Sequence, residues 1–521
     1  MKNQKVNASL VLLIFFVAAT YIPLFINGGI IVDDWGDISH NLSCLGFIDC
    51  YRTWFPLFSN RPLAPLPITA LTFIFENNYA GYLIANSLIY FLAIALCAKI
   101  IDKLCDYSTA IIFCAIASIP MIAMPLIASP INQSTATVSF LFWSLSLHSL
   151  FKFIHKDDKL SYVASYIWLL LAFLTYEVIL PLLVLSVLLP FIDKPETLLK
   201  KPLNYLTKYV LPVLLVLFLV TLWQKGVAPQ FMDVDSRLKF QPSHIIPKMH
   251  TWAHVFFAQI PKLFLKIAPY LNLYNLLTGL LIVATLWKGI RQNKLGGDPQ
   301  RAIRFTWVAT LCFLSSCSIF ILSDESAVSS GYQARGLSST WFAFALLFAG
   351  ISSLINKKHY FLIIPLVVIG FFSSISYGVQ RDQYIKSWEL QTRIIGDVSQ
   401  LILLNNVSAP AVIVGNVPKY LESNYNDEIV FSQPWDFGAA LALNTNKVVV
   451  DGFPIDSRNN DLRFINISND FVSAQNWTGS NFKNLWFYDF DPQSKRGTLL
   501  RAVNGEQLLK AIKASSNLSS R

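Results

Sequence analysis

The sequence predicts a polytopic α-helical membrane protein of about eleven transmembrane helices, followed by a small C-terminal α/β extracytoplasmic domain. Of 521 residues, 54% are hydrophobic and 14% are charged, and the mean hydropathy is +0.49. One soluble core could not bury so much apolar surface. Apolar windows of about 15 to 23 residues recur between Ser9 and Tyr377, which is the length a helix needs to cross the hydrocarbon core. They do not alternate as barrel strands would.

Positive charge predicts the topology. The net charge is +10, but the charged residues lie almost entirely between the apolar windows, so nucleic acid is not an expected partner. Every second short loop is basic, as the positive-inside rule requires for a cytoplasmic N-terminus in the inner (plasma) membrane. These loops carry Lys2, Lys5, Lys99, Lys103, Lys152, Lys156, Lys159, Lys194, Lys200, Lys201, Lys208, Lys288, Arg291, Lys294, Arg301, Arg304, Lys357 and Lys358.

The first apolar stretch, Leu10 to Ile31, is too long for a typical signal peptide and has no small-residue cleavage site, so we expect a retained helix. The fifth and sixth spans are short and meet at Thr175-Tyr176-Glu177, which predicts a pair that barely crosses or partly re-enters the membrane. The expected spans are 9–31, 80–101, 108–128, 132–154, 161–175, 178–192, 209–226, 268–289, 303–322, 337–355 and 360–377.

Two outward loops are long. The first, 32–79, holds an amphipathic stretch from Trp35 to Phe58 and an apolar one from Leu63 to Phe75, which suits helices in the membrane interface. Cys44 and Cys50 in this loop could pair in an oxidising compartment or stay free. The second loop, about 226–266, mixes prolines with charges and suits a partly ordered lid.

The composition changes after Tyr377, which predicts a membrane domain over 1–378 and a soluble domain over 379–521. An odd number of crossings places the soluble domain outside the cytoplasm. An amphipathic helix is expected over Trp388–Asn405, and a closing helix over Glu506–Ala514. Short apolar strands are expected at Ala411–Asn416, Lys447–Asp451 and Leu485–Phe490.

Three acidic residues follow the first helix directly, on the side away from the basic loops: Asp33, Asp34 and Asp37. Drawing an acid toward the bilayer centre costs roughly 2.5 to 3.5 kcal/mol, so acids clustered at this face suggest a function. A carboxylate there can accept a proton from a hydroxyl or hold a metal near a phosphate, while its neighbour tunes its basicity. The alternative is a helix end whose acids simply stay in water.

Three more charged residues are expected on the same outer face. Arg61 ends the first loop, Glu177 lies in the turn between the two short spans, and Arg335 precedes the tenth span. A guanidinium at a membrane surface suits bidentate capture of a lipid phosphate, although either arginine could be an exposed or snorkelling side chain. With the acids, they predict an outward-facing cavity of mixed charge.

This arrangement resembles the GT-C superfamily of integral-membrane glycosyltransferases, which use polyprenyl-phosphate sugars as donors. The resemblance is carried by Asp33-Asp34, the Trp-containing first loop closed by Arg61-Pro62, the short pair with Glu177, and Arg335. It looks closest to the bacterial serotype-converting glucosyltransferases, which decorate surface polysaccharide such as the O-antigen of lipopolysaccharide. It covers about residues 9–377, and the soluble domain matches no motif.

The resemblance implies a hexosyltransferase that moves a sugar from a polyprenyl phosphate in the bilayer to a surface glycan or lipid-linked acceptor. Asp33 or Asp34 would be the general base of an inverting displacement, and Arg335, with Arg61 as a second candidate, would bind the donor phosphate. Glu177 would orient the donor sugar or Arg335. A divalent cation, Mg or Mn, stays open as a cofactor, and no metal ligands are assigned.

Two other functions remain open. A polysaccharide polymerase or ligase would use arginines in a late loop, and 226–266 holds Arg237, Lys239 and His244. A transporter or flippase of lipid-linked glycans would favour ionisable groups in mid-helix and internal repeats, which the sequence lacks. His250 and His254 share a helical spacing that zinc could use, but without the glutamate of a metalloprotease helix.

Overall fold

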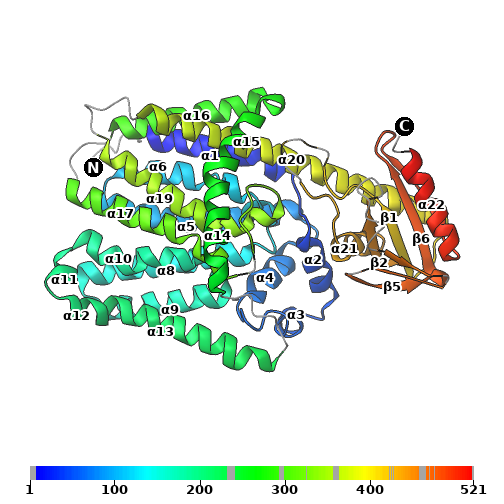
Figure 1. Ribbon diagram of the computed structural model, residues 1–521, viewed down its shortest axis with the longest axis horizontal. Helices are drawn as coiled ribbons and strands as arrows, with labels where there is room; N and C mark the ends of the chain where they lie inside the picture. Colours follow the sequence, from blue (N-terminus) through cyan, green and yellow to red (C-terminus); the bar gives the residue numbers. More distant parts are fainter. Residues whose placement is uncertain are drawn as a thin grey trace. The chain divides into compact units, whose positions relative to one another are not determined.

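The computed structural model describes residues 8–231, 241–292, 298–323, 325–355, 363–421, 423, 425, 428–456, 465–468, 470–474 and 476–518 (Figure 1). The chain forms two compact units. Unit 1 comprises Met1–Ile26, Gly46–Leu71 and Gly81–Arg381, and unit 2 comprises Asn27–Leu45, Thr72–Ala80 and Asp382–Arg521. Unit 2 therefore combines two segments of the long first loop with the C-terminal part of the chain. The boundary predicted at 378/379 stays a prediction.

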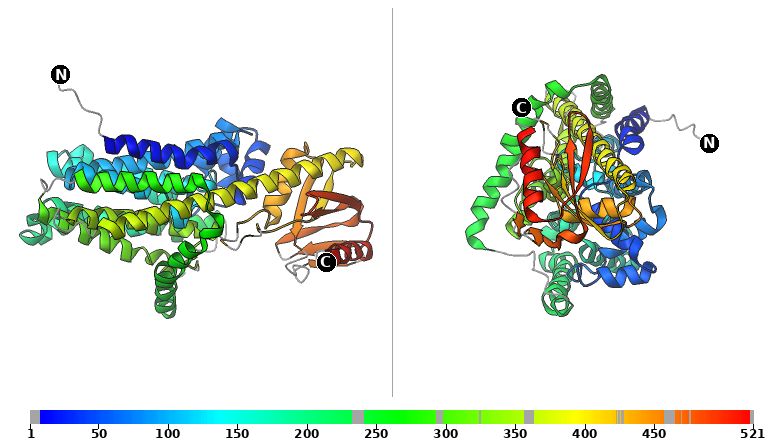
Figure 2. Two further views of the ribbon diagram at one scale, coloured as in Figure 1. Left: turned by 90° about the horizontal axis from the view of Figure 1, so that it is seen from above. Right: turned by 90° about the vertical axis from the view of Figure 1, so that its right-hand side faces the viewer.

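Unit 1 is helical, and eight helices in the described part of the chain are long and apolar enough to cross a membrane. They confirm the predicted polytopic membrane class. Figures 1 and 2 show the long helices of this unit lying side by side. The eight are Ala8–Asn27, Tyr79–Leu104, Ser134–Lys156, Pro202–Gln230, Leu273–Arg291, Pro299–Ile321, Tyr332–Leu354 and Ile363–Leu404.

The other three expected spans are short or broken. Tyr107–Ala123 and Lys159–Thr175 are shorter apolar helices. The expected fifth and sixth spans do meet as a short pair: α9 (Lys159–Thr175) ends at an extended Tyr176, and the 3-10 segment η2 (Glu177–Leu182) leads into α10 (Leu183–Asp193). Pro181 lies within η2 and Pro190 within α10, which explains the break because proline cannot donate a helical hydrogen bond.

The helices of the chain up to residue 404 have the following bounds: α1 Ala8–Asn27, α2 Asp33–Ser43, α3 Phe47–Trp54, α4 Pro65–Phe75, α5 Tyr79–Leu104, α6 Tyr107–Ala117, α7 Pro125–Ala128, α8 Ser134–Lys156, α11 Glu196–Leu199, α12 Pro202–Tyr205, α13 Leu211–Leu222, α14 Ile245–His254, α15 Ile260–Lys266, α16 Leu273–Gln292, α17 Pro299–Ser315, α18 Ser318–Ile321, α19 Ser338–Leu354 and α20 Ile363–Leu404. Short 3-10 or π segments are η1 Met121–Ala123, η3 Leu206–Val210, η4 Trp223–Val227, η5 Ala228–Gln230, η6 Pro242–His244, η7 Val255–Gln259, η8 Ala268–Tyr270 and η9 Tyr332–Leu337.

Both long loops are largely helical. The first contains α2, α3 and α4, as the amphipathic and apolar stretches predicted. In the second, Ile245–Lys266 is continuously helical through α14, η7 and α15, and α14 runs across the direction of the other helices (Figures 1 and 2). Arg237 and Lys239, which the polymerase interpretation would use, lie outside the described residues. So do Lys2, Lys5, Lys294, Lys357 and Lys358 of the basic loops.

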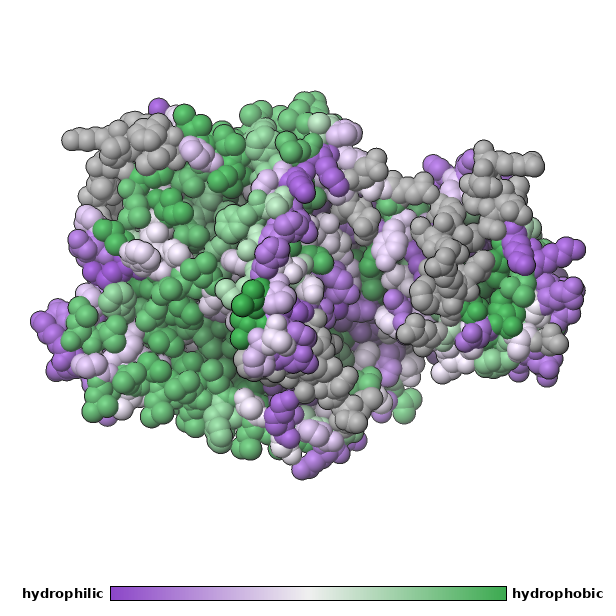
Figure 3. All heavy atoms as spheres, in the orientation of Figure 1, coloured by the Kyte–Doolittle hydropathy of each residue, from purple (hydrophilic) through white to green (hydrophobic). Residues whose placement is uncertain are grey.

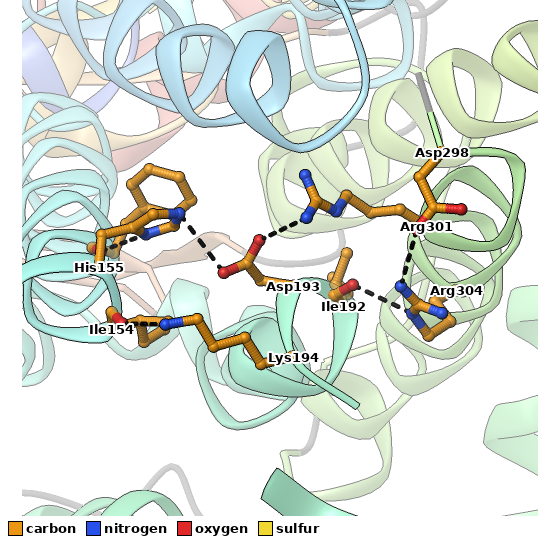
Figure 4. Close-up of polar contacts among 9 residues, drawn as sticks. Ile154, His155, Ile192, Asp193, Lys194, Asp298, Arg301 and Arg304 are labelled. Atoms are coloured by element: carbon orange, nitrogen blue, oxygen red, sulfur yellow. Dashed lines mark hydrogen bonds and ion pairs between the residues drawn. The ribbon is translucent and has the colours of Figure 1, made fainter. Parts of the chain in front are cut away.

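At the basic end of unit 1, the buried carboxylate of Asp193 contacts side chains of two other helices (Figure 4). Asp193, at the end of α10, lies 3.4 Å from Nε2 of His155 on α8 and 3.2 Å from a guanidinium nitrogen of Arg301 on α17. Lys194 Nζ donates to the carbonyl of Ile154 at 2.7 Å, and Arg304 Nε donates to the carbonyl of Ile192 at 3.1 Å. The end of α8, the end of α10 and the start of α17 therefore meet at one end, as the alternation of basic loops predicted.

The sides of these helices are apolar. Figure 3 shows hydrophobic surface over the helices of unit 1, with hydrophilic residues concentrated toward helix ends. Large exposed side chains of α9, α13 and α17 contribute, among them Ile167, Phe218 and Trp307. Such a surface suits contact with hydrocarbon rather than water.

The C-terminal part of unit 2 is an α/β domain, as predicted. A four-stranded sheet has the order β2-β1-β6-β7, in which β1 (Ala411–Asn416) pairs in parallel with β2 (Val449–Ile455) and β6 (Leu485–Asp491), and β7 (Arg496–Arg501) is antiparallel to β6. The register joins Val414 to Phe453 and Phe487. A second, antiparallel sheet contains β3 (Ile465–Ile467), β4 (Phe471–Ala474) and β5 (Trp477–Asn481).

Helices cover this sheet. The helix α21 (Pro434–Asn444) packs on β2, and α22 (Gly505–Leu518) packs on β6. The segment Trp388–Asn405 is not a separate helix as expected, since α20 runs without a break from Ile363 to Leu404. The sequence from Ser376 to Trp388 contains no proline, so nothing interrupts the backbone hydrogen bonds where the composition changes.

Candidate functional site

Arg61 and Glu177 form a buried ion pair at the end of α9 away from the basic loops. Arg61 Nε donates to Glu177 Oε2 at 2.6 Å, and a terminal guanidinium nitrogen donates to Glu177 Oε1. The guanidinium carbon lies 4.2 Å from the centre of the Tyr176 ring. The Arg61 side chain is only 8% exposed and that of Glu177 is 24% exposed. This two-point geometry fixes the plane of the Arg61 guanidinium.

The backbone around Arg61 is held from two sides. Trp223 Nε1 donates to the carbonyl of Ser59 at 2.7 Å, and Gln224 Nε2 donates to that of Asn60 at 3.3 Å. On the other side, the amide of Leu63 donates to the carbonyl of Leu174 at 3.0 Å. The end of the first loop is therefore anchored to α9 and η4, which explains how Arg61 reaches Glu177 across 116 residues of sequence.

Arg335 belongs to the same cluster. It lies in η9, with its guanidinium carbon 4.1 Å from the ring centre of Tyr332, and it is half-buried. Burial lowers the pKa of Arg61, but the Glu177 carboxylate and Tyr176 raise it, so the pKa is raised overall, while the charge of Arg335 acts in the opposite direction. The two guanidinium groups are therefore close enough to repel each other. We call Arg61, Tyr176, Glu177, Tyr332 and Arg335 the arginine cluster.

Polar side chains extend the arginine cluster toward the start of α8. Tyr332 Oη lies 3.5 Å from Asn132 Oδ1, which also accepts a hydrogen bond from Gln133 Nε2 at 2.9 Å. Gln133 is 2% exposed, and its Oε1 has no hydrogen-bond partner within the described part of the chain. A buried acceptor without a partner costs free energy, and a hydroxyl donor would satisfy it.

Asp33 and Asp34 occupy the first turn of α2 in unit 2, where the helix dipole favours negative charge. They differ in environment. Asp34 is fully buried, and its Oδ2 lies 3.4 Å from the amide of Ile31, whereas Asp33 is only half-buried. The preceding residue, Val32, has φ of 48°, a conformation that costs a β-branched residue of order 1 to 3 kcal/mol and is typical of functional sites.

The C-terminal domain supplies a direct contact to Asp33. Trp435 Nε1, on the first turn of α21, donates to Asp33 Oδ1 at 3.1 Å. The helices α2 and α21 pack closely, because a Cβ placed on Gly36 would lie 3.4 Å from the carbonyl oxygen of Trp435. Next to Trp435, Asp436 is fully buried and forms a capping box with Gln433. Acids of α2 and residues of α21 therefore form one site within unit 2.

Burial raises the pKa of Asp436 from 3.8 to about 7. Backbone hydrogen bonds from Ser432, Gln433 and Phe437 oppose the rise, and the charge of Asp33 adds to it. Asp436 therefore titrates near neutral pH beside the half-buried Asp33. A strongly shifted carboxyl group next to another acid is a feature of functional sites.

Of the five residues predicted for the site, the structure brings Arg61, Glu177 and Arg335 together in unit 1 and places Asp33 and Asp34 in unit 2. The sequence analysis missed Trp435 and Asp436. The sequence does carry a signal for the helix that holds them: Gln433, Pro434 and Asp436 occupy the N-cap, N1 and N3 positions of a helix start. Nothing in the sequence indicated that Trp435 would contact Asp33.

Metal-binding groups are absent from the part of the chain that the structure describes: no three His, Cys, Asp or Glu side chains lie together in a way that could hold an ion. His250 and His254 stack with ring centres 6.3 Å apart.

Comparison with known proteins gives a match over part of the chain. Residues 59–223 match the family described as dolichyl-phosphate-mannose-protein mannosyltransferase. This is about a third of the sequence, and it includes Arg61 and Glu177 but not Asp33, Asp34 or Arg335. No protein of curated function matches the sequence.

Two solved structures of ArnT from Cupriavidus metallidurans align with the chain at low similarity. The apo structure has 13% sequence identity and a TM-score of 0.39, and the alignment covers 95% of this chain and 99% of ArnT. The structure bound to undecaprenyl phosphate has 13% identity and a TM-score of 0.38, with 94% and 97% covered. The similarity to the mannosyltransferase family covers residues 59–223.

Proposed function

We propose that this membrane protein is a glycosyltransferase that moves one hexose from a polyprenyl-phosphate donor to a surface glycan or lipid-linked acceptor. The observation that carries the proposal is the arginine cluster, in which the charge of Arg335 acts on an Arg61 that Glu177 holds by two hydrogen bonds. Two guanidinium groups and one carboxylate leave a net positive charge, which a phosphate would neutralise. The family match over 59–223 includes both members of the ion pair.

In the proposed reaction, Asp33 accepts the proton of the acceptor hydroxyl while the acceptor oxygen attacks the anomeric carbon of the sugar. The bond from that carbon to the phosphate oxygen breaks on the opposite face, and polyprenyl phosphate leaves with the electron pair. The configuration is therefore inverted. Arg335 and Arg61 stabilise the charge that grows on the phosphate, where a preorganised cation lowers the barrier most.

Asp33 is the better general base of the acidic pair. A general base must come within hydrogen-bond reach of the proton that it removes. Asp33 is half-buried, whereas Asp34 is fully buried with its carboxylate turned toward the amide of Ile31. We assign Asp34 to holding the strained turn at Val32, and Glu177 to orienting the arginines.

We place the reaction on the extracytoplasmic side of the inner (plasma) membrane, with the N-terminus in the cytoplasm and the C-terminal domain outside. The basic ends of α8, α10 and α17 meet at one end of unit 1, which supports a cytoplasmic location for that end. Cys44 and Cys50 of the first loop are each disulfide-bonded. Disulfides persist in oxidising compartments, which supports the outer location of this loop.

The test uses the purified full-length protein in detergent, polyprenyl-phosphate hexoses with a labelled sugar, and a membrane glycan extract. The wild type is compared with Asp33→Asn and with Asp491→Asn, a control that removes an exposed acid of the C-terminal domain. A positioned general base contributes about 10²- to 10⁴-fold, so Asp33→Asn is expected to lose at least about 10²-fold of the transfer rate. Asp491→Asn is expected to match the wild type.

The outcome separates the alternatives. If folded wild-type protein consumes no monophosphate-linked sugar but extends a diphosphate-linked glycan, the chain is a polymerase or ligase. If labelled lipid moves across vesicle membranes without transfer, and Asp33→Asn moves it equally well, the chain is a transporter or flippase. Either result would overturn the proposed transferase activity.

A further inference from the structure

Within the proposed transferase activity, we infer that Trp435 of the C-terminal domain has two roles: its indole N–H orients Asp33, and its exposed ring binds the sugar ring of a glycan acceptor. This inference rests on the proposed function and names the acceptor class for the same site. It also gives the C-terminal domain a role that the sequence left open.

The first role follows from the hydrogen bond between Trp435 Nε1 and Asp33 Oδ1, which is 3.1 Å long. An indole N–H can only donate, so it engages one of the two carboxylate oxygens of Asp33, Oδ1. This bond limits rotation of the carboxylate, so its second oxygen, Oδ2, also has a defined direction. A base held in one orientation spends more of its time in the reactive geometry. Trp435 acts through Asp33 here, so in this role it is a positioning residue.

The protein fixes the position of Trp435 itself. It occupies the second position of α21, between Pro434 and the buried Asp436 of the capping box. The amides of Ser432 and Gln433 donate to the Asp436 carboxylate at 2.9 and 3.1 Å. The close approach of Gly36 to the carbonyl of Trp435 holds α2 against this turn. The indole therefore reaches Asp33 from a rigid backbone.

The second role follows from exposure. Trp435 is 46% exposed, although it lies directly beside the proposed base. Two other tryptophans of the same unit pack inside it: Trp35 is 1% exposed and stacks on Trp388 at 5.7 Å, and Trp477 is 6% exposed and stacks on Phe453 at 5.2 Å. An exposed indole with its N–H engaged presents an apolar face next to a carboxylate. The C–H face of a hexose fits that surface while one of its hydroxyls reaches Asp33.

The experiment measures kcat and the acceptor KM of the full-length protein with a labelled polyprenyl-phosphate hexose and a soluble glycan acceptor. Trp435→Phe keeps an aromatic ring and removes the N–H, whereas Trp435→Gln keeps an N–H donor and removes the ring. The control is Trp477→Phe, which removes an equivalent bond, 2.7 Å from Trp477 Nε1 to Asp451 Oδ2, elsewhere in the same unit.

We expect opposite patterns for the two variants. Trp435→Phe loses a hydrogen bond to a charged group, so its kcat is expected to fall about tenfold. Its acceptor KM is expected to stay close to that of the wild type. Trp435→Gln is expected to raise the acceptor KM about tenfold or more with a much smaller change in kcat. Trp477→Phe is expected to change neither kcat nor the acceptor KM.

Other results would overturn the inference. If both Trp435 variants transfer sugar with wild-type kcat and KM, the contact with Asp33 has no role in the reaction. If all three variants lose activity in step with a lower thermal unfolding temperature, the effect is one of stability. If the wild type itself consumes no donor, the proposed function fails and this inference fails with it, a result distinct from the first two.

Discussion

At the scale of single residues, the two arginines of the arginine cluster have different surroundings. Arg61 donates two hydrogen bonds to Glu177, whereas the guanidinium of Arg335 lies over the face of the Tyr332 ring. Arginine suits bidentate recognition of a phosphate, because its planar guanidinium presents N–H donors in a fixed fork. As in the proposed function, we therefore expect Arg335 to contact the donor phosphate and Arg61 to add positive charge.

This difference predicts the effect of replacing Arg335. Arg335→Ala is expected to lower the transfer rate about 10²- to 10³-fold, the loss seen when a preorganised transition-state contact is removed. Arg335→Lys should recover part of the rate, because lysine supplies charge without a bidentate fork. The measurement is initial-rate transfer of labelled sugar. Arg52→Ala, which removes an exposed arginine of α3, is the control, and an Arg335→Ala rate equal to that of the control would contradict the assignment.

Asp436 predicts how stability depends on pH. Its pKa is about 7 in the folded protein because it is buried, against 3.8 in the unfolded chain. The folded state therefore holds a proton that the unfolded state has lost, and this contribution to stability is complete below about pH 4 and is lost as the pH rises to about 7. The loss is on the order of 4 kcal/mol.

Asp436→Asn should remove this dependence, since an amide does not titrate but still offers an oxygen to the amides of Ser432 and Gln433. The check is the thermal unfolding temperature at pH 5 and pH 8. The wild type should lose more stability than Asp436→Asn over this interval. In Asp491→Asn the removed carboxyl group has a pKa that is already lowered, so that control should follow the wild type. Parallel curves for the wild type and Asp436→Asn would refute the prediction.

At the scale of secondary-structure elements, the basic end of unit 1 depends on one carboxylate. The Asp193 side chain is 3% exposed and lies between His155 of α8 and Arg301 of α17 (Figure 4). The Nε atom of Arg301 is buried and has no hydrogen-bond partner among the described residues. Without Asp193, Arg301 and His155 would lose the carboxylate that lies between them.

Asp193→Ala is therefore expected to destabilise the protein by about 1 to 3 kcal/mol, because it removes the buried carboxylate that Arg301 and His155 share, while water partly screens those two side chains. The matched control is Glu196→Ala. Glu196 also pairs with a lysine, Lys200 at 2.8 Å, but both side chains are more than two-thirds exposed, and such pairs contribute little. Thermal unfolding in detergent compares the two. Equal shifts of the unfolding temperature in both variants would show that the contacts of Asp193 in Figure 4 stabilise the protein no more than an exposed ion pair does.

At the scale of the whole molecule, local patterns predicted the long helices and three strands of the four-stranded sheet, but not β3, β4, β5, β7 or α21. The hydropathy windows located the long helices within a few residues, and the strand at Ala411–Asn416 was predicted with its observed bounds. These features depend on neighbours in sequence, such as apolar length and turn residues. The join of α20 was missed for the same reason, since a change of composition is not a break in the backbone.

The sites depended on contacts that a single sequence does not encode locally. Arg61 and Glu177 were both proposed, but their bidentate pairing joins positions 116 residues apart. The bond from Trp435 to Asp33 joins positions 402 residues apart. Only the packing of α2 on α21 creates that bond, so neither the role of Trp435 nor the shifted pKa of Asp436 could be predicted from spacing.

Membrane topology gives the last prediction. The proposed orientation places the basic end of unit 1 in the cytoplasm and the C-terminal domain outside. Lys200→Cys and Gln493→Cys introduce a thiol at exposed positions near the basic end and in the turn between β6 and β7. The cells keep an intact inner membrane, and a membrane-impermeant maleimide is given access to its outer face. The reagent should label Gln493→Cys under this condition. It should label Lys200→Cys only after the inner membrane is opened. The parent protein measures background from its native cysteines. Labelling of both positions in intact cells would require an even number of crossings between them. The basic loop at Lys200 would then lie outside the cytoplasm, which would contradict the positive-inside rule.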